Sequence, residues 1–325
     1  MAFKGRAIQL ALADIETQIY KKSIEAIEIE SPVFIAGLPR SGTSVLLQAL
    51  SSLSAFTSPS YRQMPFVLCP LLWDNISCPF RKNSDFVERA HGDGLKINYD
   101  SPEAFEEVVW NAFWGEKYHK DSIDIFGVQR RTSFEDYYLG YIKKILAISS
   151  KENPRYLSKN NANISRLSII KEIFKDAKII VPFREPRQHA ASLLKQHLRF
   201  LEIHKEDRFS KSYMDYLGHY EFGELHRPFN FEGRPSGDPR KIDYWISYWE
   251  SAYQHLLKQD GVFFLDYDRL CEESDVVLSQ LSEFLNTSLV DLSEDFLLPR
   301  VHDVDVELDS GVVGLYQELK SKTRR

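Results

Sequence analysis

The stretch SPVFIAGLPRSGTSVLLQAL, residues 31–50, decides the fold because it combines three elements in a fixed order. Residues 33–36 are a short apolar run, typical of a strand buried in a parallel sheet. Residues 37–42 form a loop bounded by glycines, and residues 43–53 carry apolar side chains at helical spacing. A strand, such a loop and a helix make the first half of a βαβ unit. The sequence therefore predicts an α/β fold with a parallel sheet.

The glycines of this loop have the spacing of a phosphate-binding loop, G-x-x-x-x-G-K-[ST], but the cation has moved. Thr43 stands where that pattern has lysine, and Arg40 supplies a positive charge earlier in the loop. The N–H groups at the start of the following helix still favour an anion, and Ser41, Thr43 and Ser44 add hydroxyl donors. Without the lysine that grips a γ-phosphate, we expect a phosphate-like ligand that lacks a third phosphoryl unit and binds without magnesium.

Strands and helices alternate again in the rest of the chain, which implies a parallel sheet covered by helices on both faces. At the N-terminus, apolar residues give the first 28 residues a rough helical stripe, formed by Ile8, Leu10, Leu12, Ile15 and Ile19. The further strands are expected at 155–159, 178–183 and 262–267, and the further helices at 164–174, 188–200 and 275–286.

Two stretches rich in aromatic residues, 54–150 and 200–260, separate these units. There is no internal repeat, low-complexity segment or long linker, so we expect a single domain over residues 1–325. We expect the two stretches to form helical insertions over the C-terminal edge of the sheet, where open α/β sheets bind ligands.

The bulk composition narrows the classes of function. With 325 residues, 43% of them hydrophobic, the chain can bury a large core. The formal net charge of −6 gives no basic excess for sequence-indifferent binding to nucleic acid or to a membrane surface. No apolar run approaches the ~20 residues of a membrane span, and the N-terminus has no signal-type apolar core. We therefore expect a soluble, cytoplasmic protein.

The octet GLPRSGTS, residues 37–44, resembles the 5′-phosphosulfate loop of the sulfotransferases that use 3′-phosphoadenosine-5′-phosphosulfate (PAPS). The usual form in that family is close to G-x-P-R/K-S-G-T-T, and only the last threonine differs here. The resemblance implies a P-loop-type three-layer fold, PAPS as the co-substrate and no required metal. It also implies that the phosphosulfate is held by Pro39, Arg40, Ser41, Gly42, Thr43 and Ser44.

Further segments carry the same resemblance. In VPFREPRQHAASLLKQ, Arg184 at a strand end and Ser192 in the next helix match the family's 3′-phosphate site. An arginine can pair there with phosphate bidentately while the serine donates a shorter bond. YLSKNN is similar to the family's strand ending in lysine, which would bring Lys159 to the sulfuryl group. FFLDYDRL looks like a family segment that would put Tyr267 near the adenine, although an aromatic closing the core is an equal alternative.

The chain departs from the family pattern in two places. It has no clear C-terminal Arg-Lys-Gly loop to clamp the 3′-phosphate, and Arg234, Arg240 or the tail KSKTRR are possible substitutes. Where some branches place an acidic residue, SPSYRQMPF has Arg62 and Gln63. The residues that complete the clamp and the catalytic base therefore stay open.

Sulfuryl transfer to a hydroxyl or amine requires a base near the acceptor, while Arg40 and Lys159 would stabilise the charge. His91, in the turn HGDG, is explained by neither capping nor a core stripe, so we predict it as the base. His189 is a rival because it follows Arg184 closely.

Two other groups of acidic and histidine residues have simpler explanations. The acids of SPEAFEE suit an ordinary helix start. LGHYEFGELHRPF, residues 217–229, lacks the H-E-x-x-H spacing of a helical metal site, so it is interpreted as a lid or acceptor-pocket segment. The residues concerned are Glu103, Glu106 and Glu107 in the first segment and His219, Glu221 and His226 in the second.

Three hypotheses follow. The first is a sulfotransferase acting on a small-molecule, lipid or sugar acceptor and releasing adenosine 3′,5′-bisphosphate. The second is a P-loop metabolite kinase in which Arg40 replaces the usual lysine and magnesium is required. The third is a non-catalytic relative that binds a nucleotide. The sequence identifies neither the acceptor nor the oligomeric state.

Overall fold

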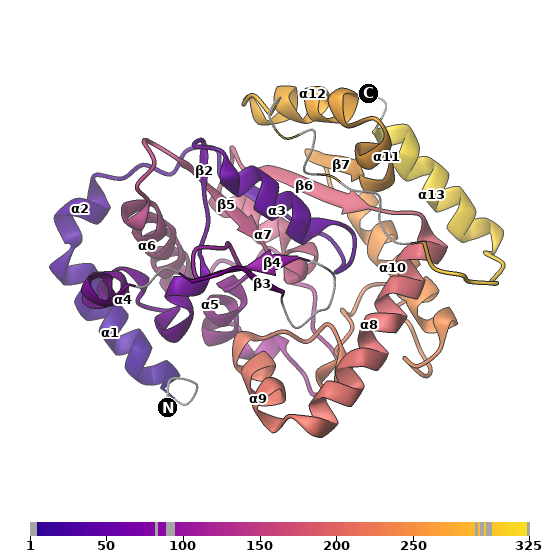
Figure 1. The fold of residues 1–325 in the computed structure, drawn as a ribbon, viewed down its shortest axis with the longest axis horizontal. Coiled ribbons are helices and arrows are strands. Elements are labelled where there is room, and N and C mark those ends of the chain that lie inside the picture. Colours follow the sequence, from indigo (N-terminus) through magenta and orange to yellow (C-terminus); the bar gives the residue numbers. More distant parts are fainter. Residues whose placement is uncertain are drawn as a thin grey trace.

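The computed structural model describes residues 5–81, 84–88, 95–289, 292, 296 and 301–323. Its centre is a five-stranded sheet in the order β2-β5-β1-β6-β7, with every neighbouring pair parallel (Figure 1). A small antiparallel pair, β3 (Val87–Glu88) with β4 (Lys96–Ile97), lies apart from this sheet. The strands of the main sheet are β1 (Val33–Ile35), β2 (Phe56–Thr57), β5 (Arg155–Lys159), β6 (Lys178–Phe183) and β7 (Val262–Asp266).

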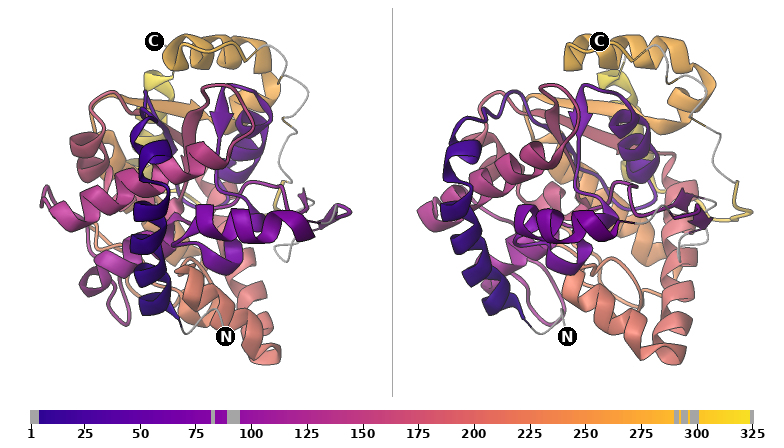
Figure 2. Two further views of the ribbon diagram at one scale, coloured as in Figure 1. Left: turned by 90° about the vertical axis from the view of Figure 1, so that its left-hand side faces the viewer. Right: turned by 60° about the vertical axis from the view of Figure 1, so that its left-hand side comes forward.

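Helices cover both faces of the sheet, so the predicted three-layer α/β fold is confirmed. Val33 and Ile35 of β1 pack with α3, α11 and α12, whereas Phe34 between them packs into the larger core on the other face. Figures 1 and 2 show α12 above the sheet and α9 below it. The helices are α1 (Arg6–Ile19), α2 (Lys21–Glu25), α3 (Thr43–Ser52), α4 (Pro70–Ser77), α5 (Glu106–Phe113), α6 (Thr132–Ile148), α7 (Leu167–Ile173), α8 (Pro186–Glu206), α9 (Arg208–Leu217), α10 (Ile242–Leu257), α11 (Tyr267–Glu272), α12 (Ser274–Leu285) and α13 (Ser310–Lys322).

The two aromatic-rich stretches contribute more to the core than to a surface flap. Trp110 lies on α5, Trp114 directly follows that helix, and Trp245 and Trp249 lie on α10; all four indoles are buried in the larger core. The stretch 54–150 also supplies a strand, β2, which extends the sheet beside β5. A strand of two residues leaves no periodic signal in a sequence, which explains why it was not predicted.

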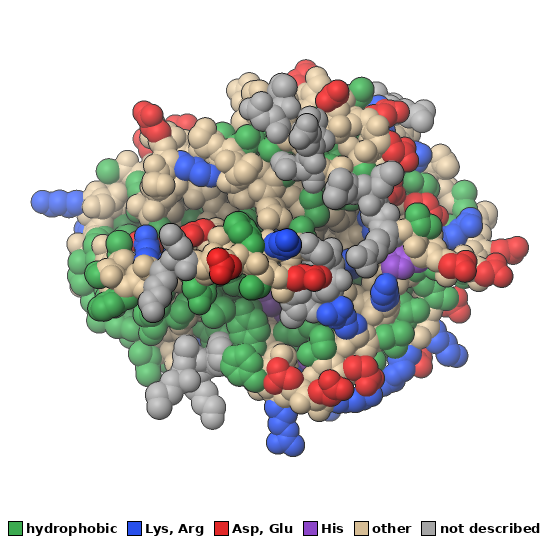
Figure 3. Space-filling view, viewed as in Figure 1, with side chains coloured by type: hydrophobic (Ala, Val, Ile, Leu, Met, Phe, Trp, Pro, Cys, Tyr) green, Lys and Arg blue, Asp and Glu red, His purple; other side chains and the backbone are tan. Residues whose placement is uncertain are grey.

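Helix α1 forms as predicted, but its apolar stripe is not the face that is buried. The buried residues of α1 are Gln9, Ala13 and Glu16. Glu16 forms an enclosed ion pair with Lys144 of α6 at 2.7 Å, and losing one partner of such a pair costs about 3–5 kcal/mol. This ion pair therefore favours the orientation in which the polar face of α1 points into the protein. Ile8, Ile15 and Ile19 stay 67%, 51% and 62% exposed, and Figure 3 shows apolar side chains gathered on the side where Figure 1 places α1 and α4.

Candidate active site

The glycine-bounded loop leaves the C-terminal end of β1, the middle strand of the sheet. Arg40 (φ 70°) and Gly42 (φ 93°) both have left-handed backbone, which turns successive N–H groups toward one concavity that suits an anion. Helix α3 begins at Thr43 without a side-chain cap, because its N-cap residue is Gly42. The loop and the helix start together form an anion site. The Ser41 hydroxyl donates to the Leu38 carbonyl (2.7 Å), so in this structure it braces the loop.

The structure brings three of the predicted donor-site residues into contact. Arg184 directly follows β6 and donates from Nη1 to the Arg40 carbonyl at 3.2 Å. Arg40 Nε in turn donates to the Ser192 hydroxyl of α8 at 3.2 Å. These residues come from β1, β6 and α8, and they meet because parallel strands end at the same edge of the sheet.

A carboxylate and a histidine that the sequence did not single out lie beside Arg184. Asp268 accepts from Arg184 Nε at 3.4 Å and from the Glu185 N–H at 2.9 Å, which fixes the guanidinium. His302 exchanges two backbone-to-side-chain hydrogen bonds with Gln188, on the first turn of α8. Burial lowers the pKa of His302, and the charges of Lys195, Arg184 and Arg40 act in the same direction. His302 therefore lies in a positively charged environment.

Tyr267, the first residue of α11, covers the loop. A Cβ atom at Gly42 would lie 2.1 Å from Cδ2 of the Tyr267 ring, so the ring rests directly against the glycine. The tyrosine is also part of the core between α3 and α12. It closes that core and borders the loop at the same time. Its place beside the adenine stays a prediction from the resemblance.

Lys159 is the last residue of β5 and pairs in register with Ile35 of β1, so it lies next to the start of the loop. Its side chain is buried. Two asparagines follow it: Asn160 caps the next turn by accepting from the Ala162 N–H at 2.9 Å, and Asn161 donates to Glu221 at 2.9 Å. The strand end thus presents a cation and two amide side chains.

A pocket opens beside these strand ends. It connects the loop and the end of β5 with the segment 217–229, which its sequence predicts to be a lid or acceptor-pocket segment. Its walls are partly aromatic and partly polar, which suits an organic molecule that carries a reactive polar group. It is lined by Pro39, Glu107, Ile123, Asn160, Ala162, Gly218, His219, Tyr220, Glu221, Arg227, Phe229 and Tyr248.

His219 and Glu221 form an ion pair within this pocket, with His219 Nδ1 and Glu221 Oε2 3.6 Å apart. Their side chains are 23% and 19% exposed, so a small molecule in the pocket can reach them. Burial raises the pKa of Glu221, but His219, Asn161 and Lys159 outweigh it and lower the pKa to about 2. The carboxylate therefore stays ionised beside the histidine.

The acids of SPEAFEE are structural. Tyr61 donates its hydroxyl to Glu103 at 2.6 Å. Glu106 is fully enclosed and accepts from Tyr138 at 2.9 Å; its burial raises its pKa. Glu107 pairs with Arg166 at 2.8 Å. Only Glu106 and Glu107 lie in the first turn of a helix, because α5 begins at Glu106 and not at Ser101-Pro102. The helix-start explanation is therefore wrong for Glu103, and each of the three carboxylates is held by partners within the protein.

His91 and His189 are the two histidines that the sequence offered as the base. His91 lies outside the described residues. His189 is enclosed, with Nε2 2.8 Å from the Pro39 carbonyl oxygen, and burial lowers its pKa to about 3. It is therefore a neutral support for the loop.

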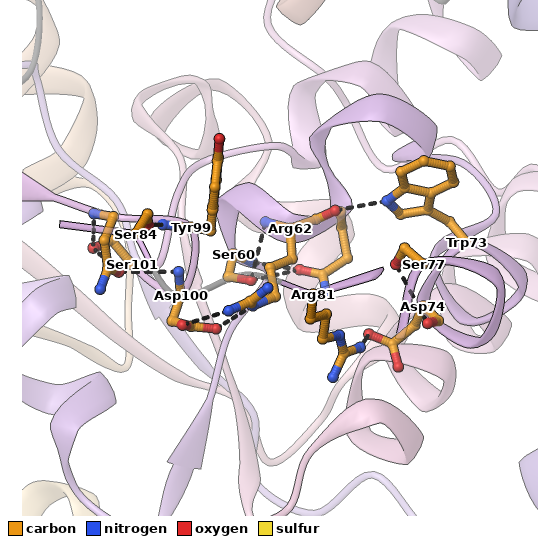
Figure 4. Close-up of polar contacts among 12 residues, drawn as sticks. Ser60, Arg62, Trp73, Asp74, Ser77, Arg81, Ser84, Tyr99, Asp100 and Ser101 are labelled. Carbon is orange, nitrogen blue, oxygen red and sulfur yellow. Dashed lines mark hydrogen bonds and ion pairs between the residues drawn. The ribbon is translucent and has the colours of Figure 1, made fainter. Parts of the chain in front are cut away.

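Arg62, which stands where some branches of the family have an acidic residue, has a structural role. It pairs with Asp100, and its carbonyl accepts from the Trp73 indole at 2.8 Å, so this arginine links surface segments (Figure 4).

The part of the chain that the structure describes shows neither a metal-type cluster nor a membrane-spanning helix. Among the residues described, no three His, Cys, Asp or Glu side chains gather in a way that would hold a metal ion. Over the same residues, no helix combines the length and the apolar character needed to cross a membrane.

Comparison with known proteins gives the family. A model of the sulfotransferase family matches residues 32–291. The solved structure of sulfotransferase STF1 from Mycobacterium tuberculosis is similar, with a TM-score of 0.50, 12% identity, and coverage of 98% of this chain and 84% of that one. The solved structure of sulfotransferase STF9 from Mycobacterium avium has a TM-score of 0.48 and 16% identity, and the match covers 87% of this chain and 70% of that one. No curated protein sequence matches the chain. Since the family match spans most of the sequence and both phosphate motifs, the chain belongs to the sulfotransferase family.

Proposed function

We propose that the protein transfers a sulfuryl group from PAPS to a hydroxyl or amine of an organic acceptor and releases adenosine 3′,5′-bisphosphate. The contact chain from Arg184 through Arg40 to Ser192 is the observation that carries this proposal. It joins a loop suited to one phosphate-like group with a strand-end arginine suited to a second one. A donor with phosphates at both ends of its ribose matches two such positions.

The chemistry of the transfer suits these groups. Sulfuryl transfer, like phosphoryl transfer, depends on in-line positioning and on stabilising charge at the transferred group and the leaving oxygen. We assign this stabilisation to Arg40 and Lys159, with the N–H groups of the loop. A sulfuryl group carries less charge than a phosphoryl group, so these cations can replace the magnesium that kinases need. PAPS would be held by Pro39, Arg40, Ser41, Gly42, Thr43, Ser44, Arg184, Ser192 and Tyr267.

The pocket beside Lys159 is the proposed acceptor site. Its lining residues come from both aromatic-rich stretches, 54–150 and 200–260, which supports their assignment to the acceptor side of a single domain over residues 1–325. Aromatic and aliphatic walls favour a small organic acceptor over a nucleic acid. The cytoplasmic location expected from the sequence stays a prediction.

Calorimetric titration of adenosine 3′,5′-bisphosphate, with EDTA present, tests the donor site. We expect micromolar binding to the wild type and at least about 10-fold weaker binding to Arg184→Ala, a loss of about 1.4 kcal/mol. The arginine is the strand-end cation of the site, and its removal also leaves Asp268 unpaired beside the ligand. Arg187→Ala is the matched control, because Arg187 lies nearby in the first turn of α8 but its side chain is 48% exposed.

The titration also separates the alternatives. Wild-type protein that ignores the bisphosphate and binds ATP only with magnesium would overturn the proposal in favour of the P-loop kinase. Wild-type protein that binds the bisphosphate but turns over PAPS with no acceptor in a broad panel would support the non-catalytic relative.

A further inference from the structure

The segment 218–226 is built to hold one pair of side chains at the edge of the sheet. Gly218 (φ 73°) and Gly223 (φ 70°) allow tight turns on either side of Glu221. A Cβ at Gly218 would lie 2.6 Å from Cγ of Glu107, and one at Gly223 would lie 2.6 Å from the His204 ring. The segment is therefore pressed against α5 and α8, and its backbone has little room to move.

Two further histidines fix this segment through its backbone. His226 lies with Nδ1 2.7 Å from the Glu221 carbonyl oxygen and Nε2 2.8 Å from the Tyr244 hydroxyl. His197 of α8 accepts from the Gly223 N–H at 3.2 Å. Burial lowers the pKa of His226 to about 3 and that of His197 to about 4, so both are neutral supports at ordinary pH. Both ring nitrogens of His226 are therefore engaged within the protein.

His219 differs from these histidines and from His189 because it borders the pocket and pairs with a carboxylate. Asn161 holds that carboxylate, and Asn161 follows Lys159 by two residues at the end of β5. The charge of Lys159 acts on both His219 and Glu221, which shows that the pair lies near the cation expected at the sulfuryl group. The Asn161 amide oxygen is buried and has no hydrogen-bond partner in the described structure.

We propose that His219 is the general base of the transfer, with Glu221 as its positioning residue. The inference rests on the sulfotransferase function proposed above. Nδ1 of His219 faces Glu221, so Nε2 accepts the proton of the acceptor O–H. The acceptor oxygen forms a bond to sulfur, and the bond from sulfur to the 5′-phosphate oxygen breaks. The electron pair of that broken bond stays on the departing bisphosphate, beside Arg40 and Lys159.

The surroundings of His219 predict the pH dependence. Burial lowers its pKa, but the carboxylate of Glu221 outweighs burial, Glu103 acts with Glu221, and Lys159 opposes them. The net pKa lies above the ordinary value of about 6.5. A base works only when unprotonated, so the rate falls as the pH drops through this raised pKa. Glu221→Gln removes the main raising charge and is expected to move the acid limb to lower pH.

The test measures cleavage of PAPS with water alone and with phenol as the probe acceptor. We expect His219→Ala to lower the rate about 100-fold, within the range for loss of a general base, while bisphosphate affinity stays within 2-fold. Added imidazole should restore part of the rate, because it replaces the missing base. His119→Ala is the matched control, since His119 forms a surface pair with Asp124 at 3.0 Å.

His91→Ala is measured in parallel, because His91 is the base predicted from the sequence. A loss that falls on His91→Ala while His219→Ala keeps at least a third of the wild-type rate overturns the proposal. So does a loss in His219→Ala that imidazole does not rescue, together with an acid limb that Glu221→Gln leaves in place. Failure of the wild type to bind the bisphosphate would instead overturn the proposed function itself.

Discussion

Gly42→Ala is expected to abolish binding of adenosine 3′,5′-bisphosphate, with an affinity at least about 1,000-fold below that of the wild type, or about 4.1 kcal/mol. The left-handed backbone of Gly42 costs any other residue about 1–2 kcal/mol. The added methyl group would also lie 2.1 Å from the ring of Tyr267, which is packed in the core and cannot retreat cheaply. The loop must therefore unwind, and its N–H groups then lose their common direction.

Gly261→Ala separates these two causes. Gly261 also has a positive φ, 64°, but a Cβ there meets nothing within 4 Å. We expect that variant to lose a little stability and to bind the bisphosphate like the wild type. The double variant Gly42→Ala, Tyr267→Ala should recover part of the lost affinity, because the methyl group then has room. Calorimetry that finds Gly42→Ala within 10-fold of the wild type would contradict the anion site described here.

How far the sequence predicts this fold depends on how local the signal is. Strands β5 and β6 lie where they were expected, because each ends at a recognisable motif and β6 is also an apolar run. The contact of Arg40 with Ser192 also follows from motifs, since the family resemblance places both at one donor. By contrast, the orientation of α1 depends on Glu16 meeting Lys144, a residue far along the chain. No periodicity within α1 carries that information.

The same reasoning explains why the sequence did not single out His219, the proposed base. In the sequence, His219 is only a histidine two positions before a glutamate in GHYE, which is a weak pattern by itself. What distinguishes His219 is the bond from Asn161 to Glu221 and the nearness of Lys159, contacts that span about sixty residues of chain. Such contacts exist only after β5 and the segment 218–226 have met. His91 stays a prediction from sequence.

Arg166→Met is expected to lower the free energy of unfolding by about 3–5 kcal/mol, the usual cost of breaking a buried ion pair. Arg166 is fully enclosed; it donates to Glu107 at 2.8 Å and to Asn163 at 3.0 Å, and its guanidinium lies 4.1 Å from the Trp110 ring centroid. Methionine fills much of the space but leaves the Glu107 carboxylate without its counter-charge. The shift in urea midpoint at an unchanged slope measures the loss.

Two further variants show whether the buried charge causes this loss. Neutralising the partner in the double variant Arg166→Met, Glu107→Gln should restore most of the stability, because no unpaired charge then remains buried. Arg130→Met, which breaks an exposed pair with Glu135, should leave the midpoint unchanged. If the double variant is no more stable than the single one, the contact with Trp110 is what stabilises this site. The ion pair would then serve mainly to hold Asn160, which donates to Glu107 at 2.7 Å, beside Lys159.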